Sequence, residues 1–196
     1  MSGGTGKLLA FVTGMTRLVA QEHPEPRLLD AVDGLMRDLV GTDDWLPEAF
    51  AVPDLQRYQQ YLLYGDPLER FSVVSFVWGP GQATPIHDHT VWGVIGMLRG
   101  AECGEAYTTA PQGGAFVSAG AAERLECGDT ARVSPSIGDV HRVCNAFDDR
   151  SSISIHVYGG NIGRVRRHVF DPRTGVPTEF VSGYSNVSVP NLWLPG

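Results

Sequence analysis

The chain has 196 residues, of which 42% are hydrophobic and 19% charged, a mixture typical of a globular domain rather than a disordered segment. Its formal net charge of −7 argues against a concentrated basic face, so we expect no nucleic-acid partner. Three cysteines without a CxxC pair predict neither a disulfide framework nor a structural zinc knuckle.

The first third of the sequence predicts helices. Apolar residues recur at a spacing of three to four over 8–19, and again over 28–40 between a Pro-Glu-Pro start and Gly41. A third segment, 53–65, also ends in a glycine, and we place it in the same helical layer, over about 1–66. Gly14, Thr16 and Arg17 interrupt the apolar N-terminal stretch, which therefore predicts neither a signal peptide nor a membrane span. A reduced, cytoplasmic protein with no membrane partner is expected.

From residue 70 onward the pattern changes to short β-branched or aromatic runs, each followed by glycine or proline, at 71–79, 91–100, 130–138 and 151–160. The long crossover segments that a parallel sheet needs are missing, so the strands should pair antiparallel. We predict a mainly β fold. A single domain over 1–196 would consist of an antiparallel β-barrel over about 70–190, packed on the N-terminal helical layer.

Two histidines, His87 and His89, stand one residue apart in a stretch that otherwise reads as an apolar strand. Residues two apart in a strand point to the same face, so the two imidazoles should project together. The pair alone has two interpretations. It indicates either a divalent-metal site or histidines that lie at the surface or are hydrogen-bonded within the protein.

The surrounding residues resemble the first signature motif of the cupin superfamily, G-x5-H-x-H-x3,4-E-x6-G. Gly81, His87, His89 and Gly100 match it, and Gly93 stands where the family carries a ligand glutamate.

A later stretch resembles the second cupin motif, G-x5-P-x-G-x2-H-x3-N. Gly138, His141 and Asn145 keep its spacing, whereas one extra residue lies on each side of Pro135, after Gly128 and before Gly138. Together the two resemblances imply a cupin-type, jelly-roll-like barrel that binds a metal through His87, His89 and His141.

Three neutral imidazoles leave a divalent metal its full charge, so such a site favours an anionic ligand, and coordination deprotonates a thiol. The same ligands would accept iron, nickel, manganese or zinc.

The run 152–160 alternates, with Ser154, His156 and Tyr158 on one face. This pattern fits a half-exposed strand with a polar outer face. It equally fits a hydrogen-bonded Ser–His–Tyr chain that ends in a tyrosine hydroxyl able to donate or accept a proton.

Three-histidine cupin ligation together with S-x-H-x-Y resembles the thiol dioxygenases of the cysteine dioxygenase family. The resemblance implies ferrous iron on His87, His89 and His141, with dioxygen and a small thiol as substrates and a sulfinic acid as product. It assigns Ser154, His156 and Tyr158 to an outer relay. We expect Trp92 and the aliphatic side chains of the barrel to keep the site dry.

Within this family the chain resembles the bacterial Gln-type branch, whose members tend to prefer 3-mercaptopropionate. Gln60 stands where animal-type members carry a carboxylate-binding arginine, and Arg167 matches the arginine that replaces it, so the resemblance implies that Arg167 and Gln60 bind the substrate carboxylate. Arg166 is an alternative ligand for the carboxylate. A further alternative is that the arginines within 164–167 form a solvated basic turn with no role in binding. Gly93 occupies the position of the crosslinking cysteine of animal enzymes, so no crosslink to the tyrosine is expected.

Cys103, Cys127 and Cys144 are expected to be small core residues. Three alternative functions remain open: a cysteine dioxygenase, a different cupin metalloenzyme, and a non-catalytic cupin that binds a metal or small ligand. The sequence identifies no exposed apolar face and makes no prediction of the oligomeric state.

Overall fold

The computed structural model describes residues 4–110 and 114–193, so the first residues of the expected helical layer, 1–3, lie outside it. Its N-terminal part forms α1 (Gly6–Val19), α2 (Glu25–Val40) and a short 3-10 helix (Glu48–Phe50). The two helices predicted over 8–19 and 28–40 are confirmed.

Short strands make up the rest of the described chain. They are β1 (Gln59–Gly65), β2 (Ser72–Trp78), β3 (Ile86–His87), β4 (Gly93–Arg99), β5 (Ala101–Thr109), β6 (Phe116–Ser118), β7 (Glu123–Glu126), β8 (Thr130–Val133), β9 (His141–Asn145), β10 (Ser152–Tyr158), β11 (Arg167–Phe170) and β12 (Pro177–Phe180). Each described pairing is antiparallel, and the predicted fold class, a cupin-type antiparallel barrel with an N-terminal helical layer, is confirmed.

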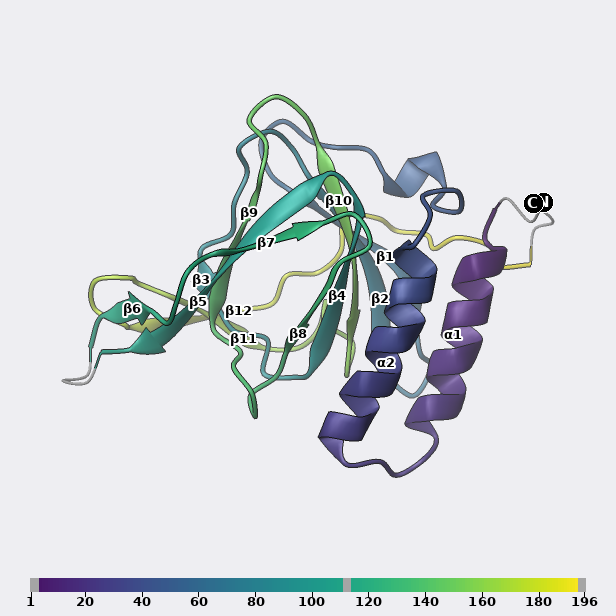
Figure 1. Cartoon of the computed structure of the whole chain (residues 1–196), viewed down its shortest axis with the longest axis horizontal. Coiled ribbons are helices and arrows are strands. Elements are labelled where there is room, and N and C mark those ends of the chain that lie inside the picture. The colour runs from purple at the N-terminus through teal and green to yellow at the C-terminus, as the bar shows by residue number, and fades with distance from the viewer. Residues whose placement is uncertain (1–3, 111–113, 194–196) are drawn as a thin grey trace.

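Two sheets face each other and enclose the barrel interior. One has the strand order β1-β2-β10-β4-β8, and the other runs β12-β11-β3-β9-β5-β6 with β7 paired to β5. Figure 1 shows α1 and α2 side by side against the outer face of the first sheet. The helical layer therefore covers one sheet only, and two of the histidines predicted to bind metal, His87 and His141, lie on the other.

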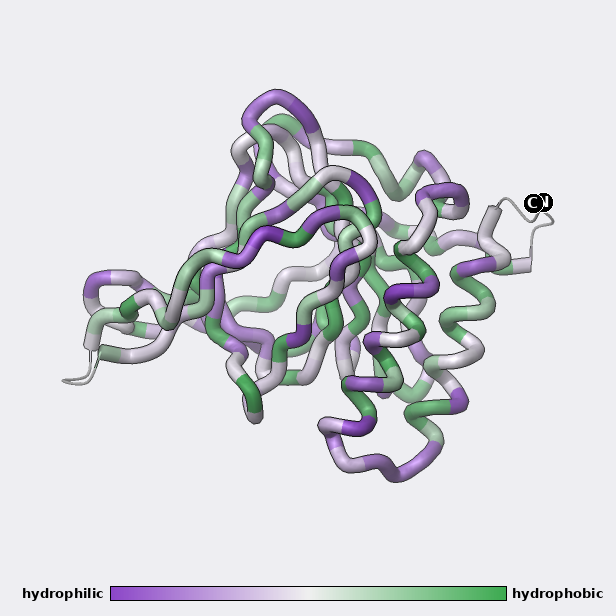
Figure 2. The backbone as a smooth tube through the Cα atoms, in the orientation of Figure 1, coloured by the Kyte–Doolittle hydropathy of each residue, from purple (hydrophilic) through white to green (hydrophobic). Residues whose placement is uncertain are grey.

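Alternation along β2 and β10 separates two cores. Val73 and Val77 of β2 pack towards the helices, whereas Phe76 and Trp78 face the barrel interior. Both strands are buried along their whole length, so the first sheet contacts protein on both faces. In Figure 2 hydrophobic segments accordingly run along the helices and the strands they cover.

The helices approach the sheet most closely at Gly96 of β4. A Cβ atom built there would lie 2.6 Å from Cγ of Met36 and 2.9 Å from Cγ1 of Val40, both on α2. Such distances are too short for any side chain, so a glycine at this position lets α2 pack directly on the strand.

The prediction that 53–65 belongs to the helical layer is wrong, because Gln59–Gly65 forms strand β1. One edge of β1 pairs with β2. Along its other edge, the backbone N–H of Ser185 donates to the Gln60 carbonyl at 2.8 Å, and the Asn186 side chain bonds both backbone groups of Leu62. Partners on both edges satisfy the backbone of this short segment, an outcome that outweighs its modest helix propensity.

The cysteines also differ from expectation. Cys127 is exposed, Cys103 and Cys144 are half-buried, and none belongs to the core.

No helix in the described ranges is long and apolar enough to cross a membrane.

Candidate metal centre

Three histidines from two strands and a loop converge inside the barrel. His87 and His141 are register partners on β3 and β9, with ring centroids 4.8 Å apart, and His89 lies 4.9 Å from each of them. One nitrogen from each ring lies within 4.8 Å of the other two, so the three could hold a metal ion. Burial, followed by repulsion from neighbouring histidines, lowers the pKa of His87 to about 3 and that of His141 well below its usual value. Both rings are therefore neutral and available as ligands.

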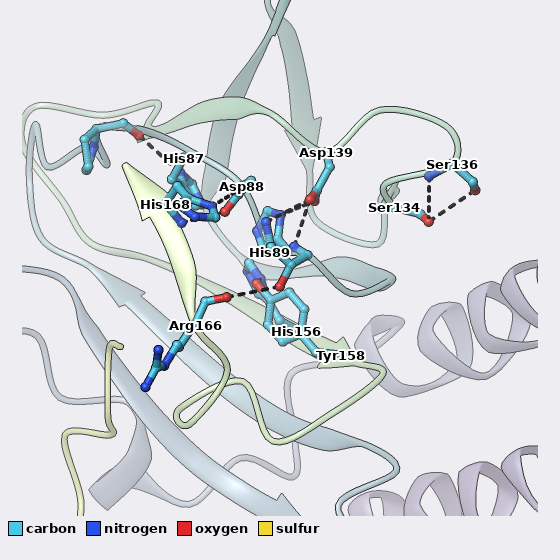
Figure 3. A network of polar contacts seen from close by, with 12 residues as sticks. His87, Asp88, His89, Ser134, Ser136, Asp139, His156, Tyr158, Arg166 and His168 are labelled. Carbon is cyan, nitrogen blue, oxygen red and sulfur yellow. Dashed lines mark hydrogen bonds and ion pairs between the residues drawn. The ribbon is translucent and has the colours of Figure 1, made fainter. Parts of the chain in front are cut away.

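Strand alternation is not what brings His87 and His89 together, since β3 ends at His87. The intervening Asp88 accepts hydrogen bonds from the backbone N–H and the ring Nδ1–H of His168, at 2.6 and 2.8 Å. This clamp fixes the chain against β11 just before His89. The expected shared strand is wrong, but the two imidazoles do project together, as Figure 3 shows.

Asp139 orients His89. One carboxylate oxygen accepts the His89 Nδ1–H at 2.9 Å, and the other accepts the backbone N–H groups of His89 and Thr90 at 3.0 and 2.8 Å. Burial raises the pKa of Asp139, but its hydrogen bonds with His89 and Thr90 outweigh burial, so the net shift is downward. The Nδ1–H of His87 donates to the Pro85 carbonyl at 3.1 Å. Both rings thus keep Nε2 free, and this second layer of partners is what metal-binding histidines generally have.

The histidines open onto a cavity of about 300 Å³. Its remaining walls are largely aromatic and aliphatic, and they include Tyr58, Phe76, Trp78, Val143 and Phe180. Trp92 instead packs against the core beneath the helices, so the expectation that it shields the site is wrong. Phe76 and Trp78 take that place, with the Phe76 ring centroid 4.2 Å from that of His156.

Ser154, His156 and Tyr158 form a continuous hydrogen-bonded chain on the interior face of β10. Ser154 Oγ lies 2.8 Å from His156 Nε2, and His156 Nδ1 lies 2.8 Å from the Tyr158 hydroxyl. All three side chains are buried, which contradicts the alternative of a half-exposed polar face. The Tyr158 ring stacks on His89 at 5.4 Å between centroids, so the hydroxyl end of the chain reaches the metal centre.

Burial fixes the protonation states in this chain. It raises the pKa of Tyr158 well above its usual value, and it lowers the pKa of His156 well below. The tyrosine is therefore a phenol and the histidine a neutral imidazole at neutral pH.

Arg167 and Arg166 point in different directions. Arg167 lines the cavity with only 3% of its surface exposed, and its Nη2–H donates to Ser182 Oγ at 2.7 Å. Its Nε has no partner among the described residues, and the guanidinium lies over the Phe180 ring at 4.7 Å. Arg166 has a side chain that is 79% exposed, and Figure 3 shows it turned away from the histidines.

Gln60 also lines the cavity. Its side-chain nitrogen donates to Ser182 Oγ and to the Gly183 carbonyl, both at 3.1 Å. Ser182 therefore connects Gln60 to Arg167.

Gly93 lies against the ring of Tyr158. A Cβ atom placed on it would be 2.7 Å from Cδ1 of Tyr158 and 3.1 Å from Cγ2 of Val133. The ring of Tyr158 thus occupies the space that a side chain at position 93 would need.

Several residues of the site were not identified from the sequence. Asp139, Asp88 and Ser182 act through other side chains, and the aromatic walls come from positions that read as ordinary strand residues. Asp139 offered a signal, because a carboxylate two residues before a ligand histidine is a natural partner for another ligand.

A barrel whose interior presents three convergent histidines beside a hydrogen-bonded Ser–His–Tyr chain defines a metal-binding protein of the cupin type. A family model described as cysteine dioxygenase type I matches residues 15–172, and the chain belongs to this family of thiol dioxygenases.

Solved structures resemble the chain more distantly. One is an uncharacterized conserved protein with a double-stranded β-helix domain from Klebsiella pneumoniae, with 21% identity over 58% of this chain and 87% of that chain and a TM-score of 0.43. Another is a Cupin 2 conserved barrel domain protein from Salinispora arenicola, with 21% identity, coverage of 59% and 86%, and a TM-score of 0.42. A third is the DMSP lyase DddQ from Ruegeria pomeroyi, with 17% identity, coverage of 65% and 60%, and a TM-score of 0.44.

Proposed function

We propose that this chain is an iron-dependent dioxygenase that converts the thiol of 3-mercaptopropionate to a sulfinic acid, using both atoms of dioxygen. The observation that carries the proposal is the buried Arg167 guanidinium, which opens onto the same cavity as the three histidines and has an unpartnered Nε. A buried guanidinium that forms no ion pair with the described carboxylates favours an anionic ligand, and it suits a carboxylate because it offers paired donors in one plane.

In this proposal His87, His89 and His141 hold Fe²⁺, which supplies coordination positions for a thiolate and for dioxygen. Arg167 binds the carboxylate end of the substrate, and Gln60 holds Arg167 in place through Ser182. The Tyr158 hydroxyl donates to or accepts from the substrate and oxygen atoms, while His156 and Ser154 orient it. The walls formed by Phe76 and Trp78 exclude water and so strengthen these polar contacts.

The choice of 3-mercaptopropionate over cysteine is supported by the charges in the cavity wall. Arg167 offers a positive charge for a carboxylate, but the described lining residues include no aspartate or glutamate to pair with an ammonium group. Cysteine would bring such a group into a buried site without a counter-charge, at a cost in binding free energy. Cysteine dioxygenase activity is accordingly the second candidate.

A cytoplasmic location is also part of the proposal, and it rests on the free cysteines.

The test is oxygen consumption by protein loaded with iron under anaerobic conditions, with 3-mercaptopropionate and L-cysteine compared as kcat/KM. We expect 3-mercaptopropionate to be preferred. Arg167→Ala should lower its kcat/KM by roughly 10²-fold, because the carboxylate would lose its charged partner in a buried site. Arg166→Ala is the matched control and should leave kcat/KM within about twofold of the wild type, because exposed charges contribute little.

A preference for cysteine would keep the thiol dioxygenase and overturn the substrate assignment. Equal losses in the two arginine variants would contradict the role given to Arg167. If iron-loaded protein took up no oxygen with either thiol, the dioxygenase proposal itself would fail.

A further inference from the structure

A buried carboxylate stands at the far end of the Ser154–His156–Tyr158 chain. Glu102 of β5 is 3% exposed and faces the Ser154 hydroxyl and the Trp78 indole, and its Oε2 has no hydrogen-bond partner among the described residues. Burial raises the pKa of Glu102 to about 7, against the lowering effect of hydrogen bonding with Ser154 and Trp78. An ionised carboxyl group in such a place costs folding free energy, and perturbed buried carboxyl groups of this kind are common at functional sites.

Among the described groups around Glu102, only Ser154 connects it to a longer chain of hydrogen-bonded side chains. Trp78 comes from β2 and Ser154 from β10, with His156 and Tyr158 following along the chain. The register neighbours of Glu102 are Asn145 on β9 and Leu125 on β7. The Asn145 amide is already bonded to the backbone of Gly79 and Arg150 and to the Ser152 hydroxyl.

A neutral imidazole carries a single N–H. The hydrogen bonds from Ser154 through His156 to Tyr158 can therefore all run in only one donor-to-acceptor direction at a time. If Glu102 is ionised, it accepts from Ser154. His156 then donates through Nε2 to Ser154, and its Nδ1 accepts the Tyr158 O–H. If Glu102 is protonated, every bond reverses, and the Tyr158 O–H is free to donate into the cavity. Ser154 also accepts from Trp78 Nε1–H, at 3.1 Å, and this bond is compatible with both directions.

We propose that Glu102 is the fourth and terminal member of the relay, and that it stores the proton which the substrate thiol loses on binding. This inference rests on the proposed function. The Tyr158 oxygen takes the thiol proton as its own O–H proton passes to His156 Nδ1. The Nε2 proton of His156 then passes to Ser154, and the Ser154 proton passes to the Glu102 carboxylate. One proton enters at Tyr158 and one is bound at Glu102, so the chain between them keeps its charge and reverses its direction.

The stored proton has a consequence for the reaction. With Glu102 protonated, Tyr158 presents an O–H to the cavity instead of a lone pair, so it becomes a donor at the stage when oxygen atoms carry developing negative charge. Glu102 does not line the cavity, so we class it as a positioning residue that acts through the chain.

The experiment that tests the relay is ¹⁵N NMR of the histidine rings in the full chain loaded with Zn²⁺, a diamagnetic ion that three imidazoles also bind. In the wild type the His156 proton should move from Nε2 to Nδ1 as the pH falls through the pKa of about 7 of Glu102. In Glu102→Gln the side chain cannot titrate, so His156 should keep one tautomer over the whole range. Glu105→Gln is the matched control on the same strand, where the carboxylate accepts from Tyr107 instead, and it should behave as the wild type.

The relay is overturned if His156 keeps one tautomer at every pH in the wild type, or if Glu102→Gln retains the wild-type response. The zinc protein performs no oxidation, so this result does not depend on the proposed function. In the iron-loaded enzyme, Glu102→Gln should lower kcat by about 10²-fold and leave KM unchanged, the lower limit for a positioned proton transfer. An unchanged kcat would overturn the storage role, whereas an inactive wild type would overturn the proposed function instead.

Discussion

Asp139 accepts three hydrogen bonds from two consecutive residues, and this makes it the side chain that fixes the orientation of the His89 ring. Thr90 has a left-handed backbone with φ of 59°, an unfavourable conformation for a β-branched residue, and its bond to Asp139 helps hold it there. The orientation of the His89 ring and of the adjoining backbone thus depends on this one carboxylate.

We predict that Asp139→Asn lowers the affinity for Zn²⁺ or Fe²⁺ by about 10- to 100-fold. An amide oxygen and a donor nitrogen cannot accept all three of these hydrogen bonds, and the negative charge is lost. Competition against a chromophoric chelator would measure the change. Asp88→Asn is the matched control, since Asp88 forms a similar pair, at 2.8 Å, with His168, which is not one of the three converging histidines. Equal losses in the two variants would mean that the loop, rather than the His89 ring, sets the affinity.

At the scale of elements, the segment after β12 closes the site from the edge of β1. The Ser182 hydroxyl accepts from both Gln60 and Arg167, so a residue outside any strand connects the first strand of the barrel to the guanidinium. Two hydrogen bonds hold that segment in register: the Ser185 N–H donates to the Gln60 carbonyl, and the Gln60 N–H donates to Ser185 Oγ.

Ser182→Ala should raise KM for 3-mercaptopropionate by about fivefold, the equivalent of one hydrogen bond of about 1 kcal/mol, with kcat nearly unchanged. The variant leaves the charge of Arg167 in place and only loosens the guanidinium. Steady-state oxygen uptake measures both constants. Ser188→Ala, at an exposed position later in the same segment, should match the wild type. A fall in kcat without a change in KM would show that Ser182 acts on the chemistry and not on substrate positioning.

The elements that the sequence predicted correctly are those with a local pattern. The apolar spacing of α1 and α2, and the alternation of Ser154, His156 and Tyr158 on β10, are properties of short consecutive segments. Strand β1 was missed because its conformation depends on β2 on one edge and on Ser185 and Asn186 on the other, residues far away in the sequence.

In the site, too, the residues predicted from the sequence are those that a local motif marks. The ligand histidines follow from a motif that resembles a known superfamily, and the convergence of all three agrees with it. Ser182 and Glu102 act through other side chains over long sequence separations, so no local spacing marks them, whereas Asp139 was marked only by its place two residues before His141. The structure also distinguishes Arg166 from Arg167: Arg167 is the first residue of β11 and lines the cavity, whereas Arg166 lies just before the strand and is exposed, a difference that the sequence did not indicate.

For the whole molecule, the first sheet separates an apolar core beneath the helices from an interior that holds titratable groups. Burial lowers the pKa of His87, His141 and His156, so the unfolded chain binds protons that the folded, metal-free protein does not. Below about pH 6.5, each such histidine lowers the free energy of unfolding by about 1.4 kcal/mol for every further unit of acidification. Stability should therefore fall as the pH falls, before the ordinary carboxyl groups titrate.

Glu102 has the opposite effect on how the free energy of unfolding depends on pH. Its pKa is about 7 in the folded protein and 4.5 in the reference state, so between these values the folded protein holds a proton that the unfolded chain has lost. Its contribution to stability is present at low pH and is lost as the pH rises through about 7. The histidines dominate below pH 6.5 and Glu102 acts alone just above it, so the metal-free protein should be most stable near pH 6.5.

Glu102→Gln should remove the effect of Glu102 on the pH dependence of stability and leave the effect of the buried histidines. Relative to the wild type, its free energy of unfolding should rise by about 3 kcal/mol between pH 4.5 and 7, because a shift from 4.5 to about 7 is worth that much when one state holds the proton. Urea unfolding of metal-free protein at a series of pH values measures the difference, and Glu105→Gln should follow the wild-type curve. A constant difference between Glu102→Gln and wild type at every pH would mean that the carboxylate does not change its protonation state on folding, and would leave the buried histidines as the source of the pH dependence.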